Sequence, residues 1–410
     1  MLTVTADTRR TLVAVAAAVL AAAALTAATP AAPAASAAGL PPNPAADPFY
    51  AQPSPFPDVA PGTVLDSRPI TIRALTLPVP IRAWQVKYRS SDTRGAAIAD
   101  VATIMQPLSP PSGPRTLVSY QTAQDGLSLD CAPSYVLATG TALPAEELAL
   151  MVPLLAAGHT VVTADYEGPN SEWTAGLNTA HGVIDGIRAA QSFAPAGLSG
   201  SATPTALMGY SGGALASQWA NEVQPTYAPE LKFAGVAAGG VPADIEYVAR
   251  RIDGGPLSGI YIGAAVGLSR AYPEIDTATL LNARGKQAFE DVGKQCIAQF
   301  SLTQAFRRMS DYTTVPQLLD VPAVRQVIAQ NVMGTRKPGS PTYFYQGIFD
   351  ELALTPPVDA LVRKYCAEGV TMQYRRILIG DHVTVAVQGA PGALAYVHDR
   401  LAGKPAPHNC

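Results

Sequence analysis

A single serine set between glycines is the feature of this sequence that most constrains its fold. Gly209-Tyr210-Ser211-Gly212-Gly213 is the only G-x-S-x-G pentapeptide in the chain. An apolar run of strand length, residues 205–208, precedes it, and a helix-compatible run, residues 214–222, follows it. Strand, tight turn and helix in this order are typical of a nucleophile elbow, which exposes its serine at the head of the helix. The context therefore favours a nucleophilic Ser211 over an ordinary glycine-serine loop.

The glycines of this turn have distinct expected roles. Gly209 and Gly213 carry no Cβ that would clash in a sharply bent backbone. The N–H of Gly212, at the predicted helix N-terminus, would face a negatively charged oxygen on a bound substrate. We therefore expect Gly212 to contribute to an oxyanion hole.

Composition narrows the range of functions. Charged residues make up 14% of the chain and hydrophobic residues 48%, against roughly 25% charged residues in typical soluble domains. These values indicate a folded chain with a large buried core. The net charge is −3 and no basic run occurs, so nothing favours nucleic acid as a partner. The cysteines form no C-x-x-C pair, and we expect neither a metal site nor a cofactor.

The N-terminus has the features of an export signal. Arg9 and Arg10 precede an apolar run over residues 11–28, and Ala35-Ser36-Ala37 is an A-x-A-type cleavage site. An uncleaved membrane anchor is the alternative, but the run is rich in alanine and only marginally apolar. We predict a signal peptide over residues 1–38 and a secreted, monomeric mature chain without a transmembrane segment.

Cysteine usage agrees with export. An even number of cysteines in an exported chain suggests two disulfides, for which three pairings are possible. The four residues are Cys131, Cys296, Cys366 and Cys410.

The mature chain divides into four predicted parts. Residues 39–66 are rich in proline and alanine and form a lead-in that wraps the surface or stays loose. Residues 67–240 open with strands of antiparallel character, over 70–75, 83–90 and 97–105, and continue with buried strands that alternate with helices, which predicts an α/β fold with a mostly parallel sheet flanked by helices. Residues 241–338 are mostly helical and are predicted to be an inserted cap or lid, unless they simply cover the sheet. Strands return in residues 339–410, which end in a helix over about 391–401.

A serine hydroxyl needs a base to take its proton and an acid to orient that base. His382 is the expected base, because it follows the last predicted strand, residues 372–379, on a loop. The other histidines are less suitable. His398 lies in the predicted terminal helix, His408 lies in the tail, and His159 and His181 do not follow a predicted strand.

The acid is expected at the same edge of the sheet. Asp350 follows the strand predicted over residues 342–346, so it would lie at the carboxyl end of a parallel strand, as Ser211 and His382 do. Glu351 is its neighbour, and Asp359 stays open as an alternative. The order serine, acid, histidine is that of the α/β-hydrolases, and the interval before Asp350 has room for the cap.

Seven short motifs together resemble the secretory lipase family, the α/β-hydrolases of the Candida-type lipase A kind, in its actinobacterial branch. The motifs lie between residues 120 and 382 and are Tyr120-Gln121-Thr122-Ala123-Gln124-Asp125, Asp130-Cys131-Ala132-Pro133-Ser134-Tyr135, Asp165-Tyr166-Glu167-Gly168-Pro169, Asp185-Gly186-Ile187-Arg188-Ala189-Ala190, Gly209-Tyr210-Ser211-Gly212-Gly213, Gly347-Ile348-Phe349-Asp350-Glu351 and Gly380-Asp381-His382. The resemblance implies an α/β-hydrolase with a helical cap that acts on carboxylic esters, typically triacylglycerols.

The resemblance also implies roles for single residues. Ser211 would be the nucleophile, Asp350 the acid and His382 the base, and Asp125 would join Gly212 in the oxyanion hole. The sequence departs from the family here, because Gln124-Asp125-Gly126 stands where an acidic-acidic-small pattern is expected. The implied disulfides are Cys131–Cys296 and Cys366–Cys410.

We therefore expect a secreted serine ester hydrolase, a triacylglycerol lipase. A short-chain carboxylesterase would use the same residues with a smaller pocket, and the apolar segment 260–268 fits either a long acyl site or a packed helix. A hydrolase-fold protein that only binds ligands at the cell envelope is a further alternative, and its mark would be the loss of a triad residue.

Overall fold

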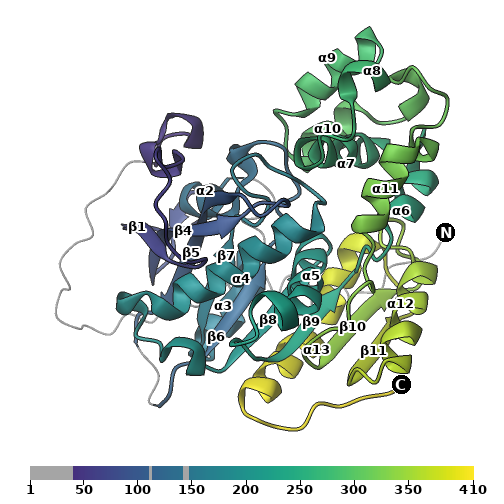
Figure 1. Ribbon diagram of the computed structural model, residues 1–410. Coiled ribbons are helices and arrows are strands. Elements are labelled where there is room, and N and C mark those ends of the chain that lie inside the picture. Colours follow the sequence, from purple (N-terminus) through teal and green to yellow (C-terminus); the bar gives the residue numbers. More distant parts are fainter. Residues whose placement is uncertain (1–39, 110–112, 142–146) are drawn as a thin grey trace, which may run out of the picture. The chain divides into compact units, whose positions relative to one another are not determined.

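The computed structural model describes residues 40–109, 113–141 and 147–410 (Figure 1). The predicted signal peptide, residues 1–38, lies outside the described residues. None of the helices in the described ranges has the length and apolar character needed to cross a membrane.

A nine-stranded sheet forms the core. Its first strands pair in an antiparallel manner, and from β7 to β11 all neighbours are parallel, which confirms the mostly parallel α/β fold and its antiparallel opening. In spatial order the strands are β1 (Val64–Ile70), β4 (Ile81–Ser91), β5 (Ala97–Pro107), β7 (Thr160–Ala164), β6 (Leu117–Gln121), β8 (Thr205–Tyr210), β9 (Phe233–Gly239), β10 (Thr342–Gly347) and β11 (Met372–Ile377).

The central strands are apolar along their whole length because helices cover both faces. Every residue of β6, β7, β8 and β10 is buried, as expected for parallel strands between two helix layers. One face packs against α4 (Gly176–Ser192), α5 (Gly212–Tyr227) and α12 (Thr355–Ala367). The other face packs against α2 (Pro133–Thr139), α3 (Leu148–Ala156) and α13 (His382–Leu401).

A helical segment, residues 241–338, separates β9 from β10 and lies at the top of Figure 1; we call it the helical insert. It has its own apolar cluster, which includes Ile262, Val292 and Phe300. Trp173 and Leu127 of the sheet-bearing part also join this cluster, so the insert and the rest of the fold share buried surface. The helices are α6 (Ile245–Ile252), α7 (Ser258–Ala271), α8 (Thr277–Leu280), α9 (Ala283–Val292), α10 (Ile297–Thr303) and α11 (Pro322–Gln330).

Two predicted elements have wrong bounds. A strand was expected over residues 70–75, but β1 ends at Ile70, and Leu75 and Thr76 adopt positive φ angles in a tight turn between β2 (Arg73–Ala74) and β3 (Leu77–Pro78). Helix α13 begins at His382 rather than near Pro391. The Asp381 carboxylate accepts a hydrogen bond from Thr384 N at 2.8 Å and starts the helix, and Pro391 lies inside it.

Buried carboxyl groups make this fold sensitive to pH. Burial raises the pKa of Glu147 to about 8, that of Asp165 to about 7 and that of Asp185 to about 6. Burial also raises the pKa of Asp100 well above its ordinary value. Each of these groups keeps its proton to a higher pH in the folded chain than in the unfolded chain.

We predict that the thermal midpoint falls as the pH rises from about 5 to 8. The unfolded chain binds fewer protons than the folded chain in this range, so the free energy of unfolding decreases with pH. Burial lowers the pKa of His159 and His181. These two histidines act in the opposite direction, because the fold loses their contribution to stability as the pH falls below about 6.5. Circular dichroism melts across this range measure the slope. Asp165→Asn should flatten it, and Asp58→Asn, at an exposed position, should not; a midpoint that rises with pH contradicts the prediction.

Candidate active site

Ser211 lies at a backbone turn that only glycine neighbours permit. Its φ angle is 54°, it caps the N-terminus of α5, and its N–H donates to Gly239 O at 2.9 Å. A Cβ added to Gly209 would lie 2.2 Å from Gly213 O, and one added to Gly213 would lie 2.0 Å from Gln121 O. Strand β8 and helix α5 therefore approach so closely that the serine between them is held in a strained backbone geometry.

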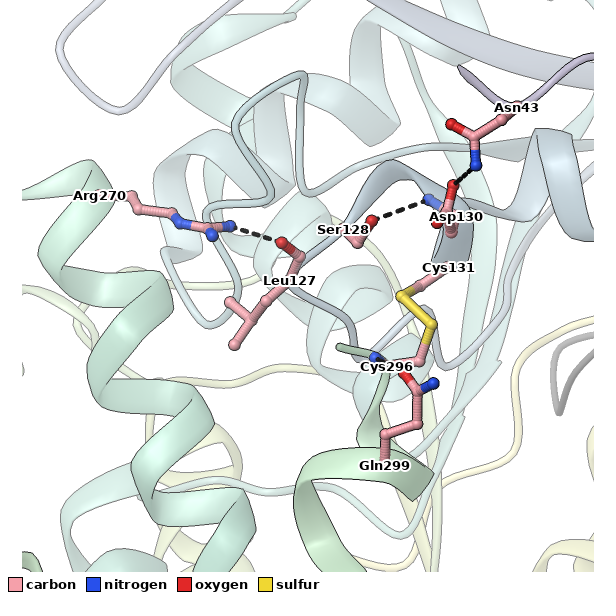
Figure 2. Close-up of a disulfide and its surroundings, with 8 residues drawn as sticks. All are labelled: Asn43, Leu127, Ser128, Asp130, Cys131, Arg270, Cys296 and Gln299. Atoms are coloured by element: carbon pink, nitrogen blue, oxygen red, sulfur yellow. Dashed lines mark hydrogen bonds between the residues drawn. A yellow bond between two sulfur atoms is a disulfide. The ribbon is translucent and has the colours of Figure 1, made fainter. Parts of the chain in front are cut away.

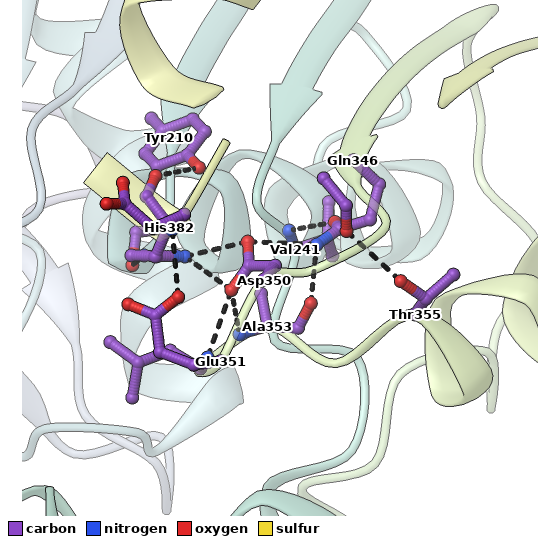
Figure 3. Close-up of polar contacts among 12 residues, drawn as sticks. Tyr210, Val241, Gln346, Asp350, Glu351, Ala353, Thr355 and His382 are labelled. Atoms are coloured by element: carbon purple, nitrogen blue, oxygen red, sulfur yellow. Dashed lines mark hydrogen bonds and ion pairs between the residues drawn. The ribbon is translucent and has the colours of Figure 1, made fainter. Parts of the chain in front are cut away.

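Three side chains from three strand ends are joined by hydrogen bonds. The Ser211 hydroxyl lies 2.8 Å from His382 Nε2. On the other side of the ring, His382 Nδ1 lies 2.8 Å from Asp350 Oδ2 (Figure 3). With Nδ1 donating to the carboxylate, Nε2 is left to accept the serine proton. The groups follow β8, β10 and β11, whose carboxyl ends share one edge of the sheet.

The Asp350 carboxylate is buried and held by several donors. It accepts hydrogen bonds from Ala353 N at 2.8 Å, from Leu352 N at 3.0 Å and from Gln346 Nε2 at 3.1 Å (Figure 3). These bonds fix the carboxylate in place without neutralising it. Gln346 gave no signal in the sequence, because a polar side chain at the end of a buried strand has many possible partners.

The backbone of His382 is fixed as firmly as its ring. Its N–H donates to Glu351 Oε2 at 3.0 Å, and its carbonyl accepts a hydrogen bond from the Tyr210 hydroxyl (Figure 3). Glu351, considered from the sequence as a neighbouring acid, thus binds the backbone and not the imidazole. Asp359, the other candidate acid, instead pairs with Arg376 and accepts from Tyr374 Oη at 3.0 Å.

Asp125 and Gly212 lie against each other beside Ser211. A Cβ added to Gly212 would lie 2.1 Å from Asp125 Oδ1. Asp125 follows β6 with a φ angle of 39°, and its Oδ1 accepts a hydrogen bond from Trp173 Nε1 at 2.9 Å. Burial raises the pKa of Asp125 to about 6, against the lowering effects of the Trp173 hydrogen bond and the nearby His382. The structure therefore brings together all five residues that the sequence assigned to chemistry.

These residues open onto a pocket with about 770 Å³ of empty space, part of which is open to solvent. Ser211, Gly212, Asp125 and His382 form its polar end. Its apolar wall comes largely from α6 and α7 of the helical insert, through Ile245, Val248, Ile252, Ile260, Tyr261 and Ala264. The pocket can therefore hold an apolar group next to the Ser211 hydroxyl. Within the described ranges, no group of three or more histidine, cysteine, aspartate or glutamate side chains is arranged to hold a metal ion.

Two disulfides are present, Cys131–Cys296 and Cys366–Cys410. This is the pairing implied by the family resemblance. The first joins the loop after β6 to the start of α10 in the helical insert, and the second ties the C-terminal tail to α12.

Comparison with known proteins gives one consistent family. Residues 136–409 match the family model described as Secretory lipase. A "Probable inactive lipase" of Mycobacterium tuberculosis is 35% identical, covering 88% of this chain and 83% of that protein, and Lipase A of Arthroderma benhamiae is also 35% identical, covering 88% and 80%. The crystal structure of Candida antarctica lipase A in its closed state superposes with a TM-score of 0.84 at 30% identity, covering 91% of both chains.

We predict that Gly213→Ala destabilises the fold by at least about 2 kcal/mol more than a control glycine substitution, because the new Cβ would overlap the backbone of Gln121. The control is Gly369→Ala, which has a φ angle of 74° but no heavy atom within 4 Å of the new Cβ, so it carries only the cost of the left-handed backbone, about 1 kcal/mol. Urea unfolding of both variants measures the difference. Equal losses would mean that the turn tolerates a side chain.

Proposed function

Since this chain belongs to the secretory lipase family of carboxylic ester hydrolases, we propose that it is a secreted triacylglycerol lipase that works through an acyl-enzyme on Ser211. The observation that carries the proposal is the hydrogen-bonded series Ser211, His382 and Asp350, whose serine lines an apolar pocket. A nucleophile, a base and an orienting acid in this geometry are what acyl transfer requires.

In the proposed reaction, Ser211 Oγ attacks the ester carbonyl carbon while His382 Nε2 takes its proton. Asp350 holds the imidazole with Nδ1 protonated and stabilises the imidazolium that forms. The N–H groups of Gly212 and Asp125 stabilise the negative charge on the former carbonyl oxygen. His382 then gives its proton to the departing alkoxide, and water, activated by the same histidine, releases the fatty acid from Ser211.

Secretion is the second part of the proposal. Two disulfides join distant parts of the chain, and such bonds persist in oxidising compartments outside the cytosol. The predicted signal peptide over residues 1–38 supports the same location.

The walls of the pocket favour a long acyl chain. A second apolar cavity, with about 570 Å³ of empty space, part of which is open to solvent, lies within the helical insert. The two cavities share Ile245, Ala249, Tyr261 and Ala264 in their walls, so they lie next to each other. A short-chain carboxylesterase would need only the first cavity.

Exposed apolar side chains next to the triad favour a lipid–water interface as the place of action. Five of them follow β10 and β11, close in sequence to Asp350 and His382, and each is at least 67% exposed. Ile348 N donates to Ile377 O at 3.0 Å, so the ends of the two strands run side by side. We call this group the rim patch; it consists of Phe349, Leu378, Ile379, Val383 and Val387. Transfer of exposed apolar side chains from water into a lipid phase lowers the free energy.

A ligand-binding protein without catalysis is the rival from a different class. One relative is named a probable inactive lipase, so membership of the family leaves room for it. This chain keeps the serine, histidine and aspartate within hydrogen-bonding distance, which favours catalysis.

We predict that Ser211→Ala and Asp350→Asn each lower kcat on p-nitrophenyl esters by about 10³-fold or more, because each removes one member of the triad. Asp359→Asn is the matched control, since that carboxylate binds Arg376 and Tyr374 instead, and it should keep kcat within about twofold. The substrates run from acetate to palmitate. Activity that rises with chain length and depends on Ser211 supports a lipase, activity confined to short chains supports the esterase, and no Ser211-dependent activity supports the binding protein.

We also predict that Leu378→Ser combined with Ile379→Ser lowers hydrolysis of emulsified triolein about tenfold, because two exposed apolar side chains that would enter the lipid phase are lost. Hydrolysis of dissolved p-nitrophenyl acetate should stay within about twofold of wild type, since neither side chain lines the pocket. The control is Leu302→Ser with Phe306→Ser, which removes two equally exposed apolar side chains from the helical insert. An equal loss on triolein in both double variants would remove any special role of the rim patch.

A further inference from the structure

The loop that carries Asp125 is bound to the helical insert by backbone hydrogen bonds. Asp125 O accepts from Ile297 N at 3.0 Å, and Leu127 N donates to Gln295 O at 3.0 Å. Between these two bonds, Gly126 and Cys296 form an antiparallel bridge. The residues that follow β6 thus behave locally as a short strand paired with the segment that starts α10.

A disulfide locks this pairing. Cys131 is buried at the end of the same loop and is bonded to Cys296, the residue that faces Gly126 (Figure 2). A Cβ added to Gly126 would lie 2.3 Å from Cys131 Cβ and 2.6 Å from its Sγ. The disulfide therefore packs directly on the residue after Asp125, with no space for a side chain between them.

Arg270 of α7 adds a third link from the helical insert. Its guanidinium donates to Leu127 O at 2.9 Å (Figure 2). It also donates to Asn170 O at 2.9 Å and to Gly293 O at 2.7 Å. One side chain thus joins the Asp125 loop, the loop after β7 and the segment before Cys296. We call the disulfide, the paired backbone and Arg270 the loop clamp.

Asp125 needs such support because its φ angle of 39° lies in a region that non-glycine residues seldom occupy. A residue in that region stays there only where its surroundings hold it. Relaxation to a negative φ would rotate the peptide groups on either side of Asp125. The direction of the N–H proposed to bind the oxyanion would then change.

We propose that the Cys131–Cys296 disulfide is a positioning element for catalysis, which holds Asp125 in the geometry that its N–H needs as an oxyanion donor. The inference rests on the proposed function. It assigns to the bond an effect on the chemical step that is separate from its effect on stability, and it makes the helical insert part of the catalytic apparatus through residues 295–297.

The test compares two double variants of the full-length mature enzyme. Cys131→Ser with Cys296→Ser removes the clamp disulfide, and Cys366→Ser with Cys410→Ser removes the distant disulfide as a control. On dissolved p-nitrophenyl butyrate, the first variant should lose about 10- to 100-fold in kcat, below the loss of about 10²- to 10³-fold seen when an oxyanion donor is deleted. Its KM should stay within about twofold, and the control should keep both values.

A second readout separates positioning from loss of folded enzyme. A trifluoromethyl ketone forms a tetrahedral adduct with the serine, and its inhibition constant should rise by the same factor as kcat/KM falls, because both depend on the oxyanion donors. A loss of folded molecules alone would lower the apparent kcat and leave this constant unchanged. Wild-type kcat and inhibition in the folded Cys131→Ser/Cys296→Ser variant would overturn the inference.

If that variant does not fold, the same bond can be reduced in the folded control variant, where it is the only disulfide left. Stepwise reduction below the thermal midpoint should lower kcat, and reoxidation should restore it; a constant kcat in the reduced, folded enzyme would overturn the inference. Ser211→Ala measured beside these variants distinguishes the two failures. Activity that survives in Ser211→Ala would contradict the proposed function itself. Activity that is lost in Ser211→Ala but kept in the enzyme without the Cys131–Cys296 disulfide would contradict only the positioning role.

Discussion

The hydrogen bonds through the His382 ring are the interaction on which the rest of the site depends. One ring links a serine that follows β8 to a carboxylate that follows β10. Parallel strands make this possible, because they end at a common edge and present the loops after them to one another. The bonds of Asp350 to Gln346 and to backbone N–H groups then fix the acid, and Glu351 and Tyr210 fix the backbone of the base. The order of the parallel strands therefore determines which side chains meet at the site.

The pocket is formed jointly by the sheet and by the helical insert. The sheet edge supplies the polar end of the pocket, and α6 and α7 of the helical insert supply its apolar wall. Trp173 connects the two, since its indole N–H donates to Asp125 and its ring packs against Phe300 of α10. A shift of the insert would therefore change the shape of the pocket and the surroundings of Asp125 together. The pocket wall and the Asp125 loop are physically coupled in this fold.

The sequence predicted the local elements better than their long-range contacts. The elbow at Ser211 was predictable because its glycines, apolar strand and helix are neighbours in the chain, and the placement of Asp350 and His382 followed from the rule for parallel strands. The start of α13 was missed because Pro391 suggested a beginning, whereas the Asp381 cap lies ten residues earlier. Gln346 and Trp173 gave no signal, because their partners are distant in sequence and contact them only after folding.

Two strained residues flank the reaction centre, and each is supported in a different way. Ser211 is held by glycines that let β8 and α5 approach closely. Asp125 is held from outside the sheet, by Trp173 and by the backbone of residues 295–297. The backbone geometry of Ser211 thus depends on neighbours in the sequence, while that of Asp125 depends on a contact with an inserted segment. A pentapeptide around the serine therefore carries information about the first of these two arrangements and none about the second.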